Sequence, residues 1–125
     1  MPKTIFLAHA ITAEQLYWQA TLESSNQQVK TFSCGLEILE TLKQDLYPCD
    51  LLIVSDTITD IDPLKLVRLL KTDPIHQKIP ILLVLTHTLA QSMGDALSTG
   101  CDEVIMYPVD PDELAQKLNF LLFKR

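Results

Sequence analysis

A polar segment with three aspartates directly follows a run of four branched apolar residues. Residues 51–54 read Leu-Leu-Ile-Val, and Ser55, Asp56, Asp60 and Asp62 come directly afterwards. Carboxylates and a hydroxyl in one short loop are the groups that bind cations, attack electrophiles or accept a phosphoryl group. Because ligands of open parallel sheets bind at the carboxyl ends of the strands, we expect the function of the chain to reside in this loop.

Two other uses of these residues can be weighed from the sequence. His9 ends the first apolar run, so His9 and Ser55 are expected at neighbouring strand ends, where they could form a base and a nucleophile. No third group that would orient the histidine is identifiable, and no glycine-rich turn supplies an oxyanion hole, so we expect no enzymatic activity. Asp60 and Asp62 could indicate a cation site, but Asp62 followed by Pro63 is explained by a helix N-cap.

The elements that must position these residues alternate along the chain. Apolar or alternating runs predict five strands, at residues 5–8, 28–32, 51–54, 81–85 and 104–106. Amphipathic segments predict five helices, which begin at Thr12, after Gly35, at Asp62–Pro63, near Leu89 and at Asp110–Pro111. This alternation predicts an α/β fold, with a five-stranded parallel sheet covered by helices on both faces.

The spacing of apolar residues predicts which face of each helix is buried. The expected core stripes are Leu16 and Ala20; Leu36, Leu39 and Leu42; Leu66, Leu69 and Leu70; Leu89, Met93, Ala96 and Leu97; and Leu114, Leu118, Leu121 and Leu122. Thr12 and Gln15 have the spacing of a capping box. Tyr17 and Trp18 are expected to be half-buried, and an exposed Trp18 would be a candidate anchor for a partner.

Length and composition exclude several classes of protein. The chain has 125 residues, enough for one domain spanning residues 1–125. A net charge of −6, without a cluster of Lys or Arg, argues against nucleic acid or an anionic membrane as partner. Apolar runs are too short for a membrane span, and the N-terminus leaves no room for a signal peptide. Three widely spaced cysteines form no CxxC pair, so we expect reduced thiols and a cytoplasmic location.

Three segments carry a specific resemblance to a known family. They are residues 50–70, residues 71–86 and residues 100–114, the last reading Gly-Cys-Asp-Glu-Val-Ile-Met-Tyr-Pro-Val-Asp-Pro-Asp-Glu-Leu. With them, nearly the whole chain resembles the receiver domain of two-component response regulators. The resemblance implies a CheY-like, flavodoxin-like (βα)5 three-layer sandwich.

The chemistry of that family needs residues that this chain has largely replaced. In the family, an acidic pair and a strand-end aspartate hold Mg²⁺, the aspartate accepts a phosphoryl group from a phosphohistidine, and a lysine pairs with that group. A threonine and an aromatic residue then relay the switch. The aligned positions here are His9 and Ala10 for the acidic pair, Ser55 for the acceptor, Tyr107 for the lysine, Thr86 for the threonine and Val104 for the aromatic.

These replacements predict a vestigial phosphoacceptor pocket formed by His9, Ala10, Ser55, Asp56, Thr86 and Tyr107, with Thr86 and Val104 at the switch positions. Since Mg²⁺ prefers hard oxygen ligands, His9, Ala10 and Ser55 predict weak or no metal binding. A serine cannot form an acyl phosphate, and a neutral tyrosine cannot offset phosphoryl charge. We therefore expect no metal and no cofactor.

The main hypothesis is a stand-alone, degenerate receiver (a pseudo-receiver) that signals by binding other proteins without phosphorylation. By resemblance, its partner surface is the face built by the fourth helix, fifth strand and fifth helix, with a homodimer as one outcome. The residues expected on that face are Gln91, Asp95, Asp112, Gln116 and Lys117.

Two alternatives remain open. Asp56 could accept phosphate through an altered loop, although Ser55 is the residue seven positions before Asp62, the spacing that the family keeps. Alternatively, a small molecule could occupy the vacated pocket, which Ala10, Ser55 and Tyr107 make less charged than the family's.

Overall fold

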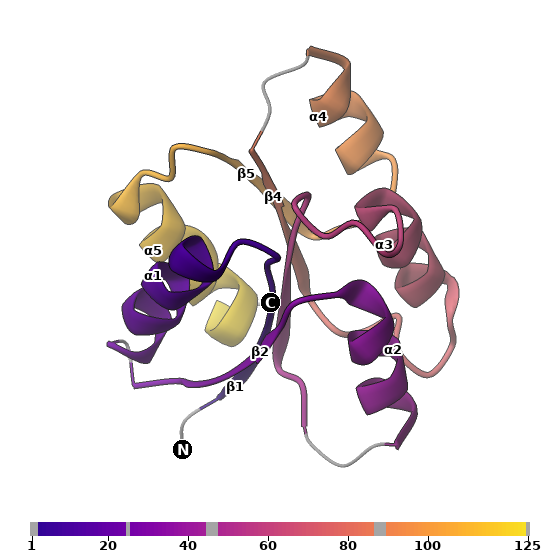
Figure 1. Ribbon diagram of the computed structural model, residues 1–125, viewed down its shortest axis with the longest axis horizontal. Helices are drawn as coiled ribbons and strands as arrows, with labels where there is room; N and C mark the ends of the chain where they lie inside the picture. The colour runs from indigo at the N-terminus through magenta and orange to yellow at the C-terminus, as the bar shows by residue number, and fades with distance from the viewer. Residues whose placement is uncertain (1–2, 25, 45–47, 87–89, 125) are drawn as a thin grey trace.

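The sheet contains five parallel strands and lies between two layers of helices (Figure 1). The computed structural model describes residues 3–24, 26–44, 48–86 and 90–124. The strands are β1 (Thr4–Ala8), β2 (Gln28–Phe32), β3 (Leu51–Ser55), β4 (Ile81–Leu85) and β5 (Glu103–Met106). The helices are α1 (Thr12–Glu23), α2 (Gly35–Gln44), α3 (Pro63–Thr72), α4 (Ala90–Leu97) and α5 (Pro111–Asn119), the last continuing into a π-helical turn, Phe120–Lys124. The predicted fold class is confirmed, with strand limits within one residue of those expected.

The strand order β2-β1-β3-β4-β5 places β3 at the centre of the sheet and β2 at one edge, as predicted. In the β1–β3 ladder Ala8 lies opposite Val54, and in the β3–β4 ladder Ser55 lies opposite Val84. Because all strands run in parallel, the segments that follow them emerge at one edge of the sheet. The order reverses direction between β1 and β3, which is the switch point where such sheets bind their ligands.

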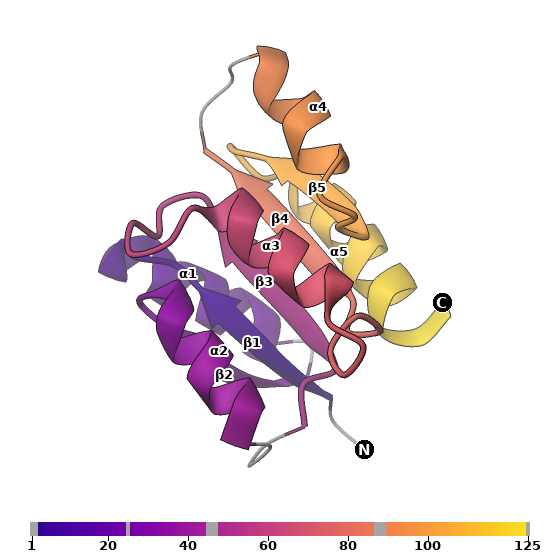
Figure 2. The ribbon, with the colours of Figure 1, turned by 90° about the vertical axis from the view of Figure 1, so that its right-hand side faces the viewer.

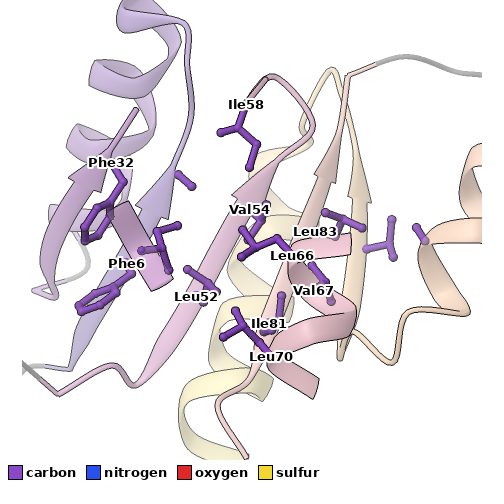
Figure 3. Close-up of a cluster of buried hydrophobic side chains, with 14 of the residues drawn as sticks. Phe6, Phe32, Leu52, Val54, Ile58, Leu66, Val67, Leu70, Ile81 and Leu83 are labelled. Atoms are coloured by element: carbon purple, nitrogen blue, oxygen red, sulfur yellow. The ribbon is translucent and has the colours of Figure 1, made fainter. Parts of the chain in front are cut away.

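Alternating side chains of the strands build one hydrophobic cluster on each face of the sheet. On one face, α2, α3 and α4 pack on residues that include Phe6, Leu52, Val54 and Leu83 (Figures 2 and 3). On the opposite face, α1 and α5 cover residues that include Ile5 and Ile53. All five residues of β3 are buried, which explains why this strand reads as an uninterrupted apolar run.

Two of the predicted helix caps are confirmed, and the capping box predicted at Thr12 is wrong, although α1 does begin at Thr12. The side chains of Asp62 and Asp110 accept hydrogen bonds from the backbone amides of Leu64 and Asp112, each at 3.0 Å. At the start of α1, by contrast, no side chain caps the helix. Gln15, the expected partner in a capping box, instead donates its amide to the carbonyl oxygens of His9 and Phe32, at 2.9 and 3.2 Å. It therefore ties α1 to the ends of two strands.

The predicted burial is confirmed for α5 and wrong in part for the other helices. Leu114, Leu118 and Leu121 are buried as expected. Leu16, Ala20, Leu36, Leu69 and Leu97 are exposed, and Leu89 lies outside the described residues. In α1 the helix turns Trp18 and Leu22 inward, so Trp18 is fully buried and Tyr17 is exposed, where both were expected to be half-buried.

The loop after β3 is fixed to the start of α2. Both carboxylate oxygens of Asp60 accept hydrogen bonds, from the amides of Gly35 and Leu36, each at 2.9 Å. Burial works against ionisation, but these amides hold the pKa of Asp60 below its usual value. The carboxylate of Asp60 therefore caps the N-terminus of α2 from a loop that is distant in the sequence, and this contact explains Asp60 without a bound cation. Ile58, from the same loop, points back into the core (Figure 3).

None of the described helices combines the length and apolar character that crossing a bilayer requires.

Replacing Asp60 with Ala is expected to lower the free energy of unfolding by about 1 kcal/mol, because two amides at the start of α2 lose their acceptor. Urea unfolding measures the loss, and Thr59→Ala, an exposed neighbour, is the control. Since the folded-state pKa of Asp60 is lowered, the difference from wild type is present above the ordinary Asp pKa of about 3.9 and disappears as the pH falls below it. A difference independent of pH would contradict this account.

Replacing Gly35 with Ala is expected to destabilise the protein by about 1–2 kcal/mol, because the new Cβ would lie 2.5 Å from Cγ2 of Ile61. Leu66 and Ile58 crowd the same position, so Ile61 has little room to move aside. Gly94→Ala in α4 is the matched control, since nothing lies within 4 Å of its added methyl group. The control should gain about 0.5–1 kcal/mol from helix propensity. Equal unfolding midpoints in urea for the two variants would show that the loop does not constrain Gly35.

Candidate functional site

The predicted site residues lie where β1, β3, β4 and β5 end. His9 follows β1, Ser55 is the last residue of β3, Thr86 follows β4 and Tyr107 follows β5. The amide of Asp56 donates to the carbonyl of Val84 at 3.0 Å, and the amide of Tyr107 donates to that of Leu85 at 2.8 Å. The backbone ladders of β3 and β5 with β4 therefore extend one residue past these strands, and they fix the positions of Asp56 and Tyr107 relative to β4.

Ser55 belongs to a buried chain of hydrogen bonds that leads to His9. The Ser55 hydroxyl lies 2.9 Å from Oγ1 of Thr57, and Oγ1 of Thr57 lies 3.3 Å from Nδ1 of His9. Backbone amides complete the chain: Thr57 N–H donates to Ser55 Oγ at 3.2 Å, and Ala10 N–H donates to Thr57 Oγ1 at 3.0 Å. The structure thus joins His9, Ala10 and Ser55 through Thr57, a residue that the sequence analysis did not single out.

The other ring nitrogen of His9 faces a carboxylate. Nε2 of His9 lies 3.0 Å from Oε2 of Glu14, on the first turn of α1. Both atoms are buried, but they are not aligned as a hydrogen bond, and neither has another partner among the described residues. Desolvation by burial lowers the pKa of His9, while the charges of Glu14 and Asp56 oppose that shift. The imidazole is therefore neutral near pH 7, and the Glu14 charge is not neutralised by it.

The tautomer of His9 follows from its backbone contact. The amide of Ile11 donates to Nδ1 of His9 at 3.2 Å, so the proton of the neutral ring resides on Nε2, facing Glu14. With that assignment, the Thr57 hydroxyl donates to Nδ1 and the Ser55 hydroxyl donates to Thr57. Nδ1 of His9 and the hydroxyls of Thr57 and Ser55 thereby all have partners, whereas Nε2 of His9 has no aligned partner among the described residues.

Asp56 is bound to Thr86 and takes no part in that chain. Its Oδ2 accepts the Thr86 amide at 3.0 Å, and its Oδ1 accepts the Thr86 hydroxyl at 2.6 Å. Ser55 and Asp56 are thus separated: the first joins His9 through Thr57, and the second joins the end of β4. Counting residues back from Asp62 could not reveal this pairing of Asp56 with Thr86.

Tyr107 and Val104 take positions apart from these contacts. Tyr107 is 42% exposed and lines a cavity next to α1. The peptide bond that joins it to Pro108 is cis. Val104 is buried in the cluster beneath α4, on the same face as Leu83 and Ala96. Because the side chain of Val104 is apolar and packed in the core, it offers no side-chain switch of the aromatic kind.

The residues at these strand ends do not fit Mg²⁺. That ion requires several oxygen ligands in octahedral geometry. Of the two carboxylates near the strand ends, Asp56 is engaged by Thr86 and Glu14 faces His9. Within the described part of the chain, no three His, Cys, Asp or Glu side chains are grouped so that they could hold a metal. Weak or no metal binding stays a prediction.

The hydrolase alternative gains one group in the structure and loses another. Glu14 is the third group that the sequence analysis did not identify, five positions after His9 in the opening turn of a helix. Ser55, however, is fully buried and reaches His9 only through Thr57. A nucleophile must contact its base and be accessible to its substrate. Ser55 does not contact His9 directly and is not accessible from the surface. The contacts therefore form a structural polar chain.

Comparison with solved structures shows the same fold. A putative response regulator from Chloroflexus aurantiacus matches with a TM-score of 0.89 at 20% identity, covering 98% of each chain. The chemotaxis response regulator CheY4 of Vibrio cholerae matches with a TM-score of 0.83 at 18% identity, covering 98% of this chain and all of that one.

Comparison with known sequences identifies the family to which the chain belongs. The response regulator SaeR of Staphylococcus epidermidis is 29% identical over 104 residues, which are 83% of this chain and 43% of SaeR. This chain thus matches less than half the length of that relative. The family model of the response regulator receiver domain matches residues 9–119. That match begins at His9, directly after β1, and includes the other four strands, so the chain belongs to the response regulator receiver family.

Proposed function

We propose that this receiver domain is degenerate and acts in two-component signalling by binding another protein in the cytoplasm, without accepting phosphate. The observation that carries the proposal is the state of the polar groups at the strand ends. The Ser55 hydroxyl is bonded to Thr57, the Thr57 hydroxyl is bonded to Nδ1 of His9, and Tyr107 stands where the family has its lysine. Phosphoryl transfer depends on positive charge at the transferred group, and these residues supply none.

The partner surface of the proposal is the face formed by α4, β5 and α5. On α5, Lys117 reaches Glu103 of β5 at 2.6 Å, so this helix and strand form a continuous surface. Leu97 of α4 and Phe120, directly after α5, are exposed large apolar residues on these elements. Asp95, Asp112 and Gln116 are exposed as predicted, and the side chain of Gln91 lies outside the described residues. Apolar residues amid charged ones are typical of transient protein interfaces.

One observation favours a second function, in which Asp56 is a working acceptor. The carboxylate of Asp56 lies against Thr86, the one residue that keeps its family identity. An acceptor next to the switch threonine is what a phosphorylation switch needs. The missing metal ligands and the missing lysine oppose this function.

The two functions differ in their response to beryllium fluoride, a mimic of the phosphorylated aspartate. With Mg²⁺ and beryllium fluoride we expect an unchanged amide NMR spectrum, because neither metal ligands nor a lysine are present to hold the mimic. Asp56→Asn is the matched control. Shifts around Asp56, Thr86 and α4 that vanish in Asp56→Asn would overturn the proposal and establish Asp56 as the acceptor.

The partner surface has its own test. We expect the wild-type chain and Asp56→Asn to capture the same protein from a lysate of the source cell, identified by mass spectrometry, because binding needs no phosphate. Leu97→Glu should reduce capture at least tenfold, since it places a charge on the proposed surface. Leu36→Glu, an equally exposed leucine on α2, is the control and should capture normally. Capture that requires a phosphodonor, or that Leu36→Glu abolishes instead, would contradict the proposal.

A further inference from the structure

A cavity of about 360 Å³ lies between α1 and the segment that joins β5 to α5. One wall is a stripe of α1 that includes Glu14, Tyr17 and Trp18, and the other includes Tyr107 and Pro108. Figure 1 shows α1 and α5 side by side on the same face of the sheet. The volume falls within the range of small-molecule sites, about 300–1,000 Å³. The cavity is thus large enough for a small ligand, and it lies beside the vacated pocket.

Aromatic side chains dominate the lining of this cavity. Trp18 is buried, whereas Tyr17 and Tyr107 are 62% and 42% exposed and contribute to opposite walls. Pro108 and Pro111 add rigid apolar surface. Aromatic rings bind flat apolar groups by stacking, and their faces attract cations. The walls therefore suit a planar ligand, and a positively charged one in particular.

Glu14 is the one charged side chain among the described residues that line the cavity. Its Oε2 is buried next to the neutral His9 without forming an aligned hydrogen bond. A carboxylate that lacks a cationic partner at the edge of an apolar cavity is complementary to an ammonium group. The charge of the site thus selects for the same kind of ligand as its aromatic walls.

We propose that this cavity binds a small aromatic molecule that carries a protonated amine, with the ring between Tyr17 and Tyr107 and the ammonium at Glu14. The cavity and the partner face both draw on α5 but use different residues of it, so binding of an amine can be tested separately from the proposed function. Because Glu14 lies against His9, and His9 connects through Thr57 to Ser55, a bound amine is sensed at the ends of β1 and β3.

The test is an amide NMR titration with phenethylamine, compared with phenylacetate and 2-phenylethanol, which replace its ammonium with a carboxylate and a hydroxyl. Phenethylamine should bind with a Kd of about 1 mM, the range for so small a ligand. Shifts should be saturable in α1, at residues 107–111, and at His9 and Thr57. Phenylacetate should not bind, and 2-phenylethanol should bind at least fivefold more weakly.

Matched variants separate the carboxylate from the helix that carries it. Glu14→Gln should weaken phenethylamine binding at least fivefold. Tyr107→Ala should also weaken binding, and because Tyr107 lies outside α1, this loss cannot come from a change in the helix. Glu23→Gln, at the far end of the same helix and outside the lining, should bind as wild type does.

Three outcomes would overturn the proposal. The first is equal affinity of wild type and Glu14→Gln for the amine. The second is equal binding of all three probes, which would indicate an unspecific apolar patch. The third is the appearance of the same shifts on raising the protein concentration without amine, which would indicate that a second copy of the chain fills the cavity.

Discussion

The parallel pairing of β3 with β1 and β4 is the constraint on which the site depends. All five residues of β3 are buried, so a shift of register by one residue would turn Ser55 and the apolar side chains to the wrong faces. The ladders therefore fix which side chains meet beyond the strand ends. Ser55 comes level with the residue after β1, and Asp56 comes level with the end of β4. The Asp60 cap then holds the loop after β3 against α2, so these contacts cannot drift apart.

The sheet and its core do not dictate the chemistry at the strand ends. The core needs only apolar side chains of suitable shape at the strand positions, and it places no demand on the residues that follow the strands. At those positions the chain now has hydroxyls, a neutral imidazole and two carboxylates. The two hydroxyls and Nδ1 of the imidazole are joined by hydrogen bonds, which offsets the cost of burying them, whereas Nε2 of His9 has no aligned partner among the described residues. A phosphoryl group would add negative charge near Asp56 and Glu14 without a cation to balance it.

How far the sequence predicts this structure depends on whether a feature is local. Strand limits and the caps at Asp62 and Asp110 follow from hydrophobic runs and from neighbouring residues, and they agree with the structure. The rotation of α1 about its axis does not follow, because it depends on packing against residues that are distant in the sequence, such as Ile53 and Leu114. Trp18 is turned inward and Leu16 outward, although the spacing of apolar residues predicts that Leu16 and Ala20 form the buried stripe.

The contacts of the site were missed for the same reason. Glu14 reaches His9 only because α1 has this rotation, and Gln15 reaches the ends of β1 and β2 for the same reason. A periodicity argument treats both as ordinary polar residues of a helix start. Thr57 could have been singled out, since it lies two positions after Ser55 and continues the alternation of β3. The sequence thus locates the site at the strand ends but not its hydrogen-bond partners.

The choice between Ser55 and Asp56 as the family's acceptor position brings spacing and geometry into conflict. Spacing to Asp62 favours Ser55, whereas the contact with Thr86 favours Asp56. The conflict does not change the chemistry. If Ser55 holds the position, the acceptor lacks a carboxylate and is fully buried. If Asp56 holds it, the carboxylate is present, but Tyr107 still replaces the lysine, and no described cluster can hold the metal. In both registers the charge that would stabilise a phosphoryl group is missing, and that deficit makes binding without phosphorylation the favoured function.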